Sequence, residues 1–128
     1  MTRSAEELVE LARRRIDRVP PSALDEVLAR GGLVVDIRPA AQRAEEGELD
    51  GAVVIERNVL EWRLDPEGAH RIPQVSGHDQ RIVVACWEGY ASSLAAASLA
   101  DLGFGNASDL EGGVRAWQAW IRRKVARL

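Results

Sequence analysis

Short apolar runs alternate with amphipathic stretches along the whole chain. Residues 33–37 and 81–85 are rich in β-branched side chains and bounded by glycine, proline or polar residues, which is typical of buried strands. Shorter runs at 53–55 and 107–110 are two further strand candidates. Segments with helical periodicity lie between these runs. Strands separated by helices predict an α/β fold with a mainly parallel central sheet, covered by helices on both faces in three layers.

Several of the helical segments have recognisable starts. Ser4 is followed three residues later by Glu7, which is a capping-box pattern and predicts a first helix over residues 5–17. Ser22 is predicted to cap a second, short helix that runs to residue 29. Further helices are expected at residues 40–46, 59–64 and 92–102, and from the glycine pair at 112–113 to the end of the chain.

The length of 128 residues is enough for one domain and too short for two. We expect an N-terminal helical extension at residues 1–19 and a single domain over residues 20–128. A net charge of -3 does not favour binding to nucleic acid or to an anionic membrane surface. No apolar run approaches the roughly 20 residues of a membrane span. The charged start of the chain lacks the apolar core of a secretory signal, so a cytoplasmic location is expected.

The single cysteine, Cys86, follows a predicted strand and precedes a predicted helix. In a parallel sheet, ligands bind beyond the carboxyl ends of the strands, and the unpaired N–H groups of the next helix point to the same place. This environment favours the thiolate, which is the nucleophilic form of cysteine. Gly89 allows the loop to turn several N–H groups inward around an anion. The alternative is that Cys86 is an inert small apolar residue at the end of a strand.

Four segments in series carry a family resemblance: VVDIRP at 34–39, GELDGAVVI at 47–55, CWEGYASS at 86–93 and DLEGGVRAW at 109–117. In this order and spacing they resemble single-domain rhodanese-like proteins, in particular a subgroup of small bacterial rhodaneses. The resemblance covers about residues 20–120. It implies a three-layer rhodanese-like fold and a sulfurtransferase activity.

The resemblance also implies a role for each matching residue. Cys86 would be the nucleophile, taking sulfane sulfur from thiosulfate or another persulfide donor and passing it to a thiol or to cyanide. No metal or organic cofactor is implied. The loop would supply the substrate-binding cradle, through Trp87, Glu88, Gly89, Tyr90, Ala91 and Ser92. Candidates for a supporting role near the site are Asp36, Arg38, Arg57 and Arg63.

The cysteine loop departs from the family pattern in two places. Many rhodanese-like proteins carry a basic residue five positions after the cysteine, where this chain has Ala91. Glu88 adds a carboxylate that should repel a dianion such as thiosulfate. Arg38, Arg57 or Arg63 would have to compensate for it. Without compensation, a neutral or protein-bound persulfide donor is more plausible than thiosulfate.

Two other classes of function share this arrangement. A cysteine-dependent phosphatase needs an arginine fork, typically six positions after the cysteine, where this chain has Ser92. A binding or sulfur-sensing module would keep the fold and use the pocket without turnover. The sequence also leaves open whether the terminal helices pack on the domain or on a second copy, as in a homodimer.

Several conspicuous residues have a structural interpretation. Asp36 is expected to bond the loop backbone or Arg38, and Ser92 and Ser93 to cap the helix that follows the cysteine loop. Trp87 is expected either to form a wall beside the thiol or to pack on the neighbouring helix, and Tyr90 is a second candidate for that wall. The two histidines lie in residues 67–79, an aperiodic segment expected to be a loop, with no spacing that suggests a metal site.

Overall fold

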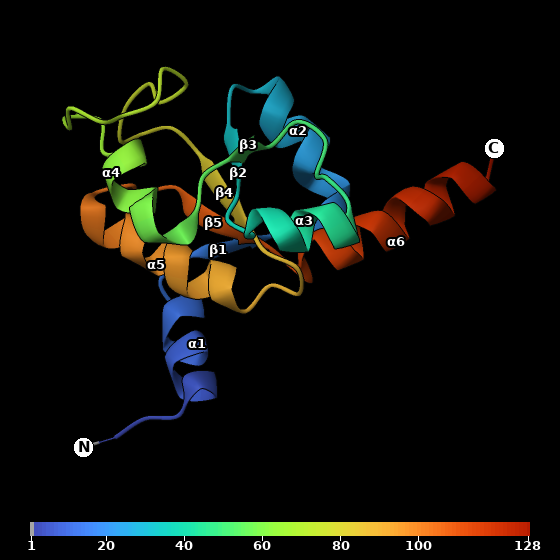
Figure 1. Cartoon of the computed structure of the whole chain (residues 1–128), viewed down its shortest axis with the longest axis horizontal. Coiled ribbons are helices and arrows are strands. Elements are labelled where there is room, and N and C mark those ends of the chain that lie inside the picture. The colour runs from blue at the N-terminus through green and yellow to red at the C-terminus, as the bar shows by residue number, and fades with distance from the viewer. Residues whose placement is uncertain (1) are drawn as a thin grey trace.

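A computed structural model describes residues 2–128 and contains one five-stranded sheet in which every pair of neighbouring strands is parallel. The strand order is β1-β5-β4-β2-β3, so β4 lies at the centre of the sheet (Figure 1). The strands are β1 (Asp17–Val19), β2 (Leu33–Asp36), β3 (Val53–Val54), β4 (Ile82–Ala85) and β5 (Ala107–Leu110). The predicted α/β class and the parallel sheet are confirmed.

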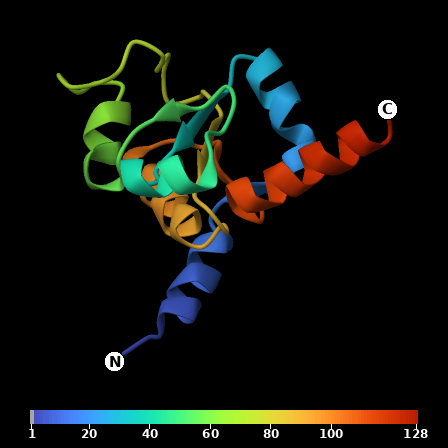
Figure 2. The same ribbon diagram turned by 45° about the vertical axis from the view of Figure 1, so that its right-hand side comes forward.

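Helices cover both faces of this sheet (Figures 1 and 2). One face packs against α4 and α5, and the other packs against α2 and α6. The helices are α1 (Ala5–Arg13), α2 (Leu24–Ala29), α3 (Ala40–Glu46), α4 (Leu60–Leu64), α5 (Ala91–Leu102) and α6 (Gly113–Ala126), with 3-10 turns before α2 (Pro21–Ala23) and before α4 (Arg57–Val59). The three-layer arrangement is therefore also as predicted.

The central strand β4 shows how the sequence builds two cores. Successive side chains of a strand point to opposite faces. Ile82 and Val84 accordingly belong to the cluster under α4 and α5, whereas Val83 and Ala85 belong to the cluster under α2 and α6. All four are fully buried, which is why this segment reads as an unbroken apolar run. Cys86 continues the alternation and faces the cluster under α4 and α5.

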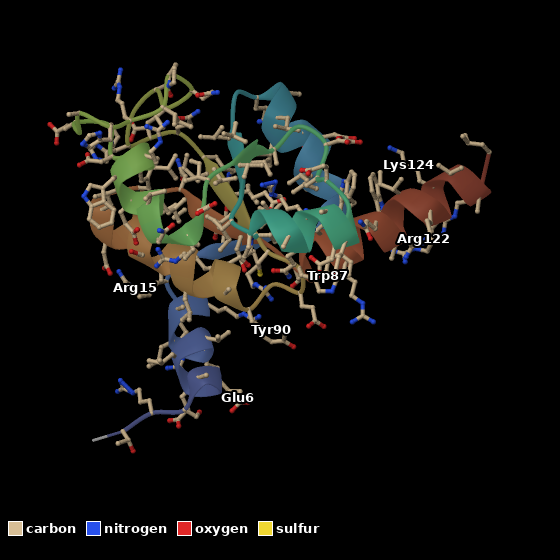
Figure 3. All side chains as sticks on the ribbon, in the orientation of Figure 1. Glu6, Arg15, Trp87, Tyr90, Arg122 and Lys124 are labelled. Carbon is tan, nitrogen blue, oxygen red and sulfur yellow. The ribbon has the colours of Figure 1, made fainter. Side chains whose placement is uncertain are left out.

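The two terminal helices extend away from the sheet. Figure 1 shows α1 leaving the body beneath α5, and α6 carrying the C-terminus outward, where Figure 3 labels Arg122 and Lys124. The docked side of α1 buries Val9 and Ala12. Within residues 2–128, no helix combines the length and the apolar character needed to cross a membrane.

The first helix is shorter than predicted. It ends at Arg13, and Asp17–Val19 forms β1, a strand that pairs with β5 at the edge of the sheet. The prediction of a helix over residues 5–17 was therefore wrong at its end. A strand of three residues carries no periodicity of its own, and it forms only because the open edge of β5 supplies its hydrogen bonds. Residues 17–19, which we assigned to an N-terminal extension, thus complete the sheet.

The predicted helix starts are right in one case and wrong in two. Ser4 and Glu7 form both hydrogen bonds of a capping box. Ser22 lies inside a 3-10 turn, and α2 begins after it without a side-chain cap. Ser92 and Ser93 are buried within the first turn of α5, where their hydroxyl groups bond other partners instead of capping the helix. Residues 67–79 form a loop without helix or strand, as predicted.

Candidate active site

Cys86 lies where the central strand β4 runs into the loop before α5. The residue is 9% exposed. The Sγ atom accepts hydrogen bonds from the backbone N–H of Gly89 at 3.2 Å and of Ser92 at 3.4 Å. As a thiol it donates to Ser92 Oγ at 3.3 Å. Two N–H donors on one sulfur stabilise a negative charge there, because hydrogen bonds to an ionised acceptor are stronger than those to a neutral one.

The start of α6 supports the loop from outside. The N–H of Val114 donates to the carbonyl of Cys86 at 2.9 Å, and that of Arg115 donates to the carbonyl of Trp87 at 3.0 Å. Gly113 makes this approach possible. It has a φ of 68°, and a Cβ atom there would lie 2.2 Å from the Trp87 carbonyl oxygen. The contact explains why a glycine pair stands at this junction.

A buried carboxylate holds the next part of the loop. Asp109, at the end of β5, is fully buried and accepts hydrogen bonds from the hydroxyl groups of Ser92 at 2.9 Å and Ser93 at 2.8 Å. Arg18 donates to both carboxylate oxygens, at 3.0 and 3.2 Å. A buried charge is tolerated only when it is paired and hydrogen-bonded in this way. The network connects β1, β5 and α5 directly behind the cysteine.

The carbonyl oxygen of Gly89 accepts hydrogen bonds from two arginines. The donors are Arg13 Nη2 at 2.8 Å and Arg18 Nη2 at 3.0 Å, and Ser93 Oγ, whose single proton goes to Asp109, lies 3.1 Å away. Arg13 also donates through Nε to Ser93 Oγ at 3.1 Å. Gly89 adopts a φ of 90°, a conformation that glycine reaches without strain. Two guanidinium groups from the N-terminal segment therefore bind the back of the cysteine loop.

A cavity of about 550 Å³ opens beside Cys86. Four residues of the predicted cradle line the cavity: Trp87, Glu88, Tyr90 and Ala91. The other two, Gly89 and Ser92, donate their backbone N–H groups to the sulfur. The lining residues of the cavity come from three loops and the helices that follow them: Ile37, Arg38, Pro39, Gln42, Glu56, Arg57, Asn58, Cys86, Trp87, Glu88, Tyr90 and Ala91. Trp87 both lines the cavity and packs against the cluster under α2 and α6, so its two proposed roles are combined.

Arg38 lines this cavity, but its guanidinium already bonds two carboxylates and a backbone carbonyl. Its guanidinium donates to Asp36 at 2.7 Å, to Glu46 at 3.2 Å and to the carbonyl of Gly47 at 2.8 Å, and both Arg38 and Asp36 are 1% exposed. Burial disfavours the charged guanidinium, but the hydrogen bonds and charges of Asp36 and Glu46 outweigh it and raise the pKa of Arg38 above its ordinary value. Arg38 therefore anchors the loop after β2.

The other two candidate arginines differ in position. Arg57 lines the cavity and forms an ion pair with Glu61 at 3.0 Å. Burial raises the pKa of Glu61, but the hydrogen bond from Ser98 and the charge of Arg57 outweigh it, so the net pKa is lowered. Arg63 does not line the cavity, because it donates to the carbonyl of His70 at 2.7 Å on the loop after α4. The structure therefore does not bring Arg63 to the site.

Glu88 lines the cavity from the cysteine loop. It is exposed and pairs with Arg115 of α6 at 3.1 Å, a surface ion pair that weakens its negative charge without removing it. Glu56 also lines the cavity and has no salt bridge within residues 2–128. Both arginines that line the cavity are paired with carboxylates, so its lining carries no uncompensated cation. No cluster of three or more metal-ligating side chains occurs in the described part of the chain.

These features define an α/β protein with a parallel sheet, in which a cysteine that accepts backbone N–H hydrogen bonds lies in the loop between the central strand and the next helix. Comparison of the sequence with known protein families identifies the family within this class. The model of the rhodanese-like domain family matches residues 20–119. The chain belongs to the rhodanese-like family.

Two relatives and one solved structure are similar to this chain over most of its length. The thiosulfate sulfurtransferase GlpE of Ectopseudomonas mendocina is 30% identical over 109 residues, covering 85% of this chain and 91% of the relative. The protein of the same name from Pseudoalteromonas translucida is 39% identical over 97 residues, with coverages of 74% and 81%. A solved structure from Rhodopseudomonas palustris, described as a protein of unknown function and possible tyrosine phosphatase, has a TM-score of 0.82 at 28% identity, covering 94% of this chain and 92% of that one.

Sequence reasoning missed the residues that support the loop from behind. Asp109 could have been recognised from the sequence, since a carboxylate inside a predicted buried strand needs a hydrogen-bonding or charged partner. The contacts of Arg13 and Arg18 with Gly89 could not have been predicted, because these residues are 76 and 71 positions away from Gly89 in the sequence.

Proposed function

We propose that this protein is a sulfurtransferase in which Cys86 carries sulfane sulfur as a persulfide. The observation that carries the proposal is the position of Sγ, which borders the cavity while two backbone N–H groups bind it from the loop. A persulfide extends the side chain by one sulfur and places the transferable atom in the cavity. The relatives named as thiosulfate sulfurtransferases support the same reaction class.

The reaction consists of two displacements at sulfur. The Cys86 thiolate attacks the sulfane sulfur of the donor, a new S–S bond forms, and the old one breaks with its electron pair leaving on the departing group. That group is sulfite when the donor is thiosulfate and a thiolate when the donor is a persulfide. A thiol or cyanide then attacks the outer sulfur, and Cys86 leaves as the thiolate from which it started.

The charges around the cavity favour a persulfide donor over thiosulfate. Thiosulfate carries two negative charges, and a sulfonate group in the cavity would meet Glu56 and Glu88. Arg38 and Arg57 are already paired with carboxylates, so they offer less attraction than free cations would. A persulfide carries at most one charge at its reacting end. We therefore place a low-molecular-weight or protein persulfide ahead of thiosulfate as the donor.

A phosphatase reaction is disfavoured by the same geometry. Its arginine fork would have to stand at position 92, where the buried Ser92 donates its hydroxyl proton to Asp109. Arg13 and Arg18 reach the loop, but they bond the Gly89 carbonyl and do not line the cavity. The description of the Rhodopseudomonas palustris structure as a possible tyrosine phosphatase therefore does not extend to this chain.

The first test follows the mass of the intact protein. Purified, reduced protein and a Cys86→Ser variant are incubated with thiosulfate and, separately, with glutathione persulfide. We expect a gain of one sulfur atom that is absent in the variant and reversed by cyanide with release of thiocyanate. The persulfide donor should act faster than thiosulfate at equal concentration.

Each outcome has a definite meaning. A gain of sulfur from either donor, lost on addition of cyanide, supports the transferase. Faster loading by thiosulfate would contradict the donor preference but not the chemistry. No gain from either donor, with a folded protein and a free thiol, would refute the sulfurtransferase proposal and leave a binding or sensing module of the same fold.

A further inference from the structure

Arg13 is the last residue of α1 and lies outside residues 20–119, the part that matches the family model. Its half-buried side chain nevertheless makes three contacts with the cysteine loop and the start of α5. Nη2 donates to the Gly89 carbonyl at 2.8 Å, Nε donates to Ser93 Oγ at 3.1 Å, and the guanidinium lies 5.4 Å from the centre of the Tyr90 ring. Figure 3 labels Tyr90 at the side of the molecule from which α1 extends.

Arg13 differs from the other arginines around the site because no carboxylate is paired with it within residues 2–128. Arg18 is paired with Asp109, Arg38 with Asp36 and Arg57 with Glu61. Arg13 has no carboxylate within 4.0 Å in residues 2–128. Its positive charge is therefore not cancelled locally. A half-buried cation attracts an anion more strongly than a solvated one, because less water screens it.

The contact with Gly89 also sets the direction of a backbone donor. In a trans peptide the carbonyl and the N–H of the next residue point in opposite directions. Arg13 and Arg18 hold the Gly89 carbonyl toward the back of the loop, and neither arginine lines the cavity beside Cys86. The N–H of Tyr90 then points toward the opposite, cavity side. It has no acceptor within residues 2–128.

We infer that Arg13 is a positioning residue of the anion cradle around Cys86. It turns the N–H of Tyr90 into the cradle and adds the positive charge that Ala91 does not supply. The inference deepens the proposed function, since the anion it serves in that reaction is the thiolate or persulfide of Cys86. The charge acts from behind the loop, so it favours the thiolate or persulfide and attracts an anionic reagent that reaches the sulfur, without donating a hydrogen bond to that reagent.

The test compares two alkylating reagents that differ in charge, iodoacetate and iodoacetamide. Both react with the Cys86 thiolate. The iodoacetamide rate alone reports the reactivity of that thiolate, and the ratio of the two rates reports the attraction of a second anion to the sulfur. We expect Arg13→Gln to lower the iodoacetate to iodoacetamide ratio about three- to tenfold, as one lost charge at close range implies. Arg13→Lys keeps the charge but not the two-pronged hydrogen bonding, so it should retain at least about half of the wild-type ratio.

Arg14→Gln is the matched control. Arg14 is the next residue, is exposed, and makes no side-chain hydrogen bond within residues 2–128. The Arg14→Gln substitution removes the same charge from the same end of α1. Because solvent screens the charge of Arg14, the iodoacetate to iodoacetamide ratio of this variant should stay within about a factor of 1.5 of wild type. The thermal unfolding midpoint and helix content of each variant show that α1 and the domain are intact.

The outcomes separate this inference from the proposed function. An equal ratio in Arg13→Gln and Arg14→Gln, with both proteins folded, would overturn it. An equal loss in Arg13→Lys and Arg13→Gln would overturn the part assigned to charge. The alkylation assay needs no sulfur transfer, so a failure of Cys86 to accept sulfur would refute the transferase while the role of Arg13 at the cradle is decided by the ratio alone. If both hold, sulfur transfer by Arg13→Gln should fall about tenfold.

Discussion

Ala91 occupies the position, five residues after the cysteine, at which the family resemblance led us to expect a basic residue in many relatives. It is exposed, lines the cavity and begins α5 one residue after Tyr90. A side chain from this position enters the cavity that a donor must occupy. The cations already at the cavity wall, Arg38 and Arg57, are bound to carboxylates. A new cation at position 91 would therefore be the first that a sulfonate could bind without competition.

We accordingly expect Ala91→Arg to raise kcat/KM for thiosulfate about tenfold and to change kcat/KM for glutathione persulfide less than threefold, because only the dianion gains a full ion pair. The control is Leu94→Arg, which adds the same charge one turn later at an exposed position outside the cavity. Initial rates at several salt concentrations check the prediction, since the gain should shrink as salt screens the charge. Equal gains for both donors, or for both variants, would contradict it.

The sequence indicated the cysteine and its loop but not the groups behind them. Cys86 could be found because it directly follows a buried strand, a feature visible in the neighbouring residues alone. The partners of that loop come from β1, α1 and β5, which are distant in sequence. A contact between Arg13 and Gly89 depends on how α1 docks against α5, and no local pattern encodes that docking.

At the scale of elements, prediction succeeded where the signal is local and periodic. β2 and β4 are buried along their whole length and each contains consecutive β-branched side chains, and α5 is a long segment followed by Gly103. β1 failed this criterion, because three residues that pair at the edge of β5 show neither a run nor a period. The two serines of α5 were misread as caps because Ser is common at helix starts, whereas here a buried carboxylate from β5 binds their hydroxyl groups.

The junction between α6 and the cysteine loop provides a test at this scale. Gly113→Ala would place a Cβ atom 2.2 Å from the Trp87 carbonyl oxygen at a φ of 68°, so the loop or the start of α6 must shift. We expect a loss of about 2–4 kcal/mol in the free energy of unfolding. The shift should also cost at least about tenfold in sulfur loading of Cys86, because misplaced atoms near a reacting group reduce its rate steeply.

Gly105→Ala is the control for this substitution. Gly105 lies in the turn before β5, and an added Cβ atom there has no neighbour within 4 Å. Its effect on unfolding should stay within about 0.5 kcal/mol. Urea titrations followed by tryptophan fluorescence, together with the mass assay for sulfur loading, measure both quantities. Similar losses in the two variants would show that the contact between Gly113 and Trp87 is not what holds the loop.

At the scale of the whole molecule, the N-terminal segment serves two different purposes. β1 belongs to the sheet, since Val19 is buried and Arg18 neutralises the buried Asp109. α1 lies outside the sheet and contributes Arg13 to the loop. We therefore propose that the boundary between the accessory helix and the domain lies between Arg13 and Asp17, three or more residues before the division at residue 20 that the sequence suggested.

Two shortened chains distinguish these purposes. A chain starting at Asp17 loses the α1 contacts of Val9 and Ala12, and we expect it to fold with a loss of no more than about 2 kcal/mol. A chain starting at Pro20 also loses β1, which opens the edge of β5 and leaves Asp109 without its guanidinium. Breaking a buried ion pair by removing one partner costs about 3–5 kcal/mol, so this chain should be markedly less stable.

Urea unfolding of both chains beside the full-length protein measures the difference, and the alkylation ratio adds a second readout. The chain from Asp17 should remain folded but show the lowered ratio of Arg13→Gln, since it keeps Arg18 and lacks Arg13. Equal stability of the two shortened chains would mean that β1 contributes little to the sheet. A wild-type alkylation ratio in the chain from Asp17 would mean that the cradle is complete without α1, and the rhodanese-like domain would then contain its whole active site.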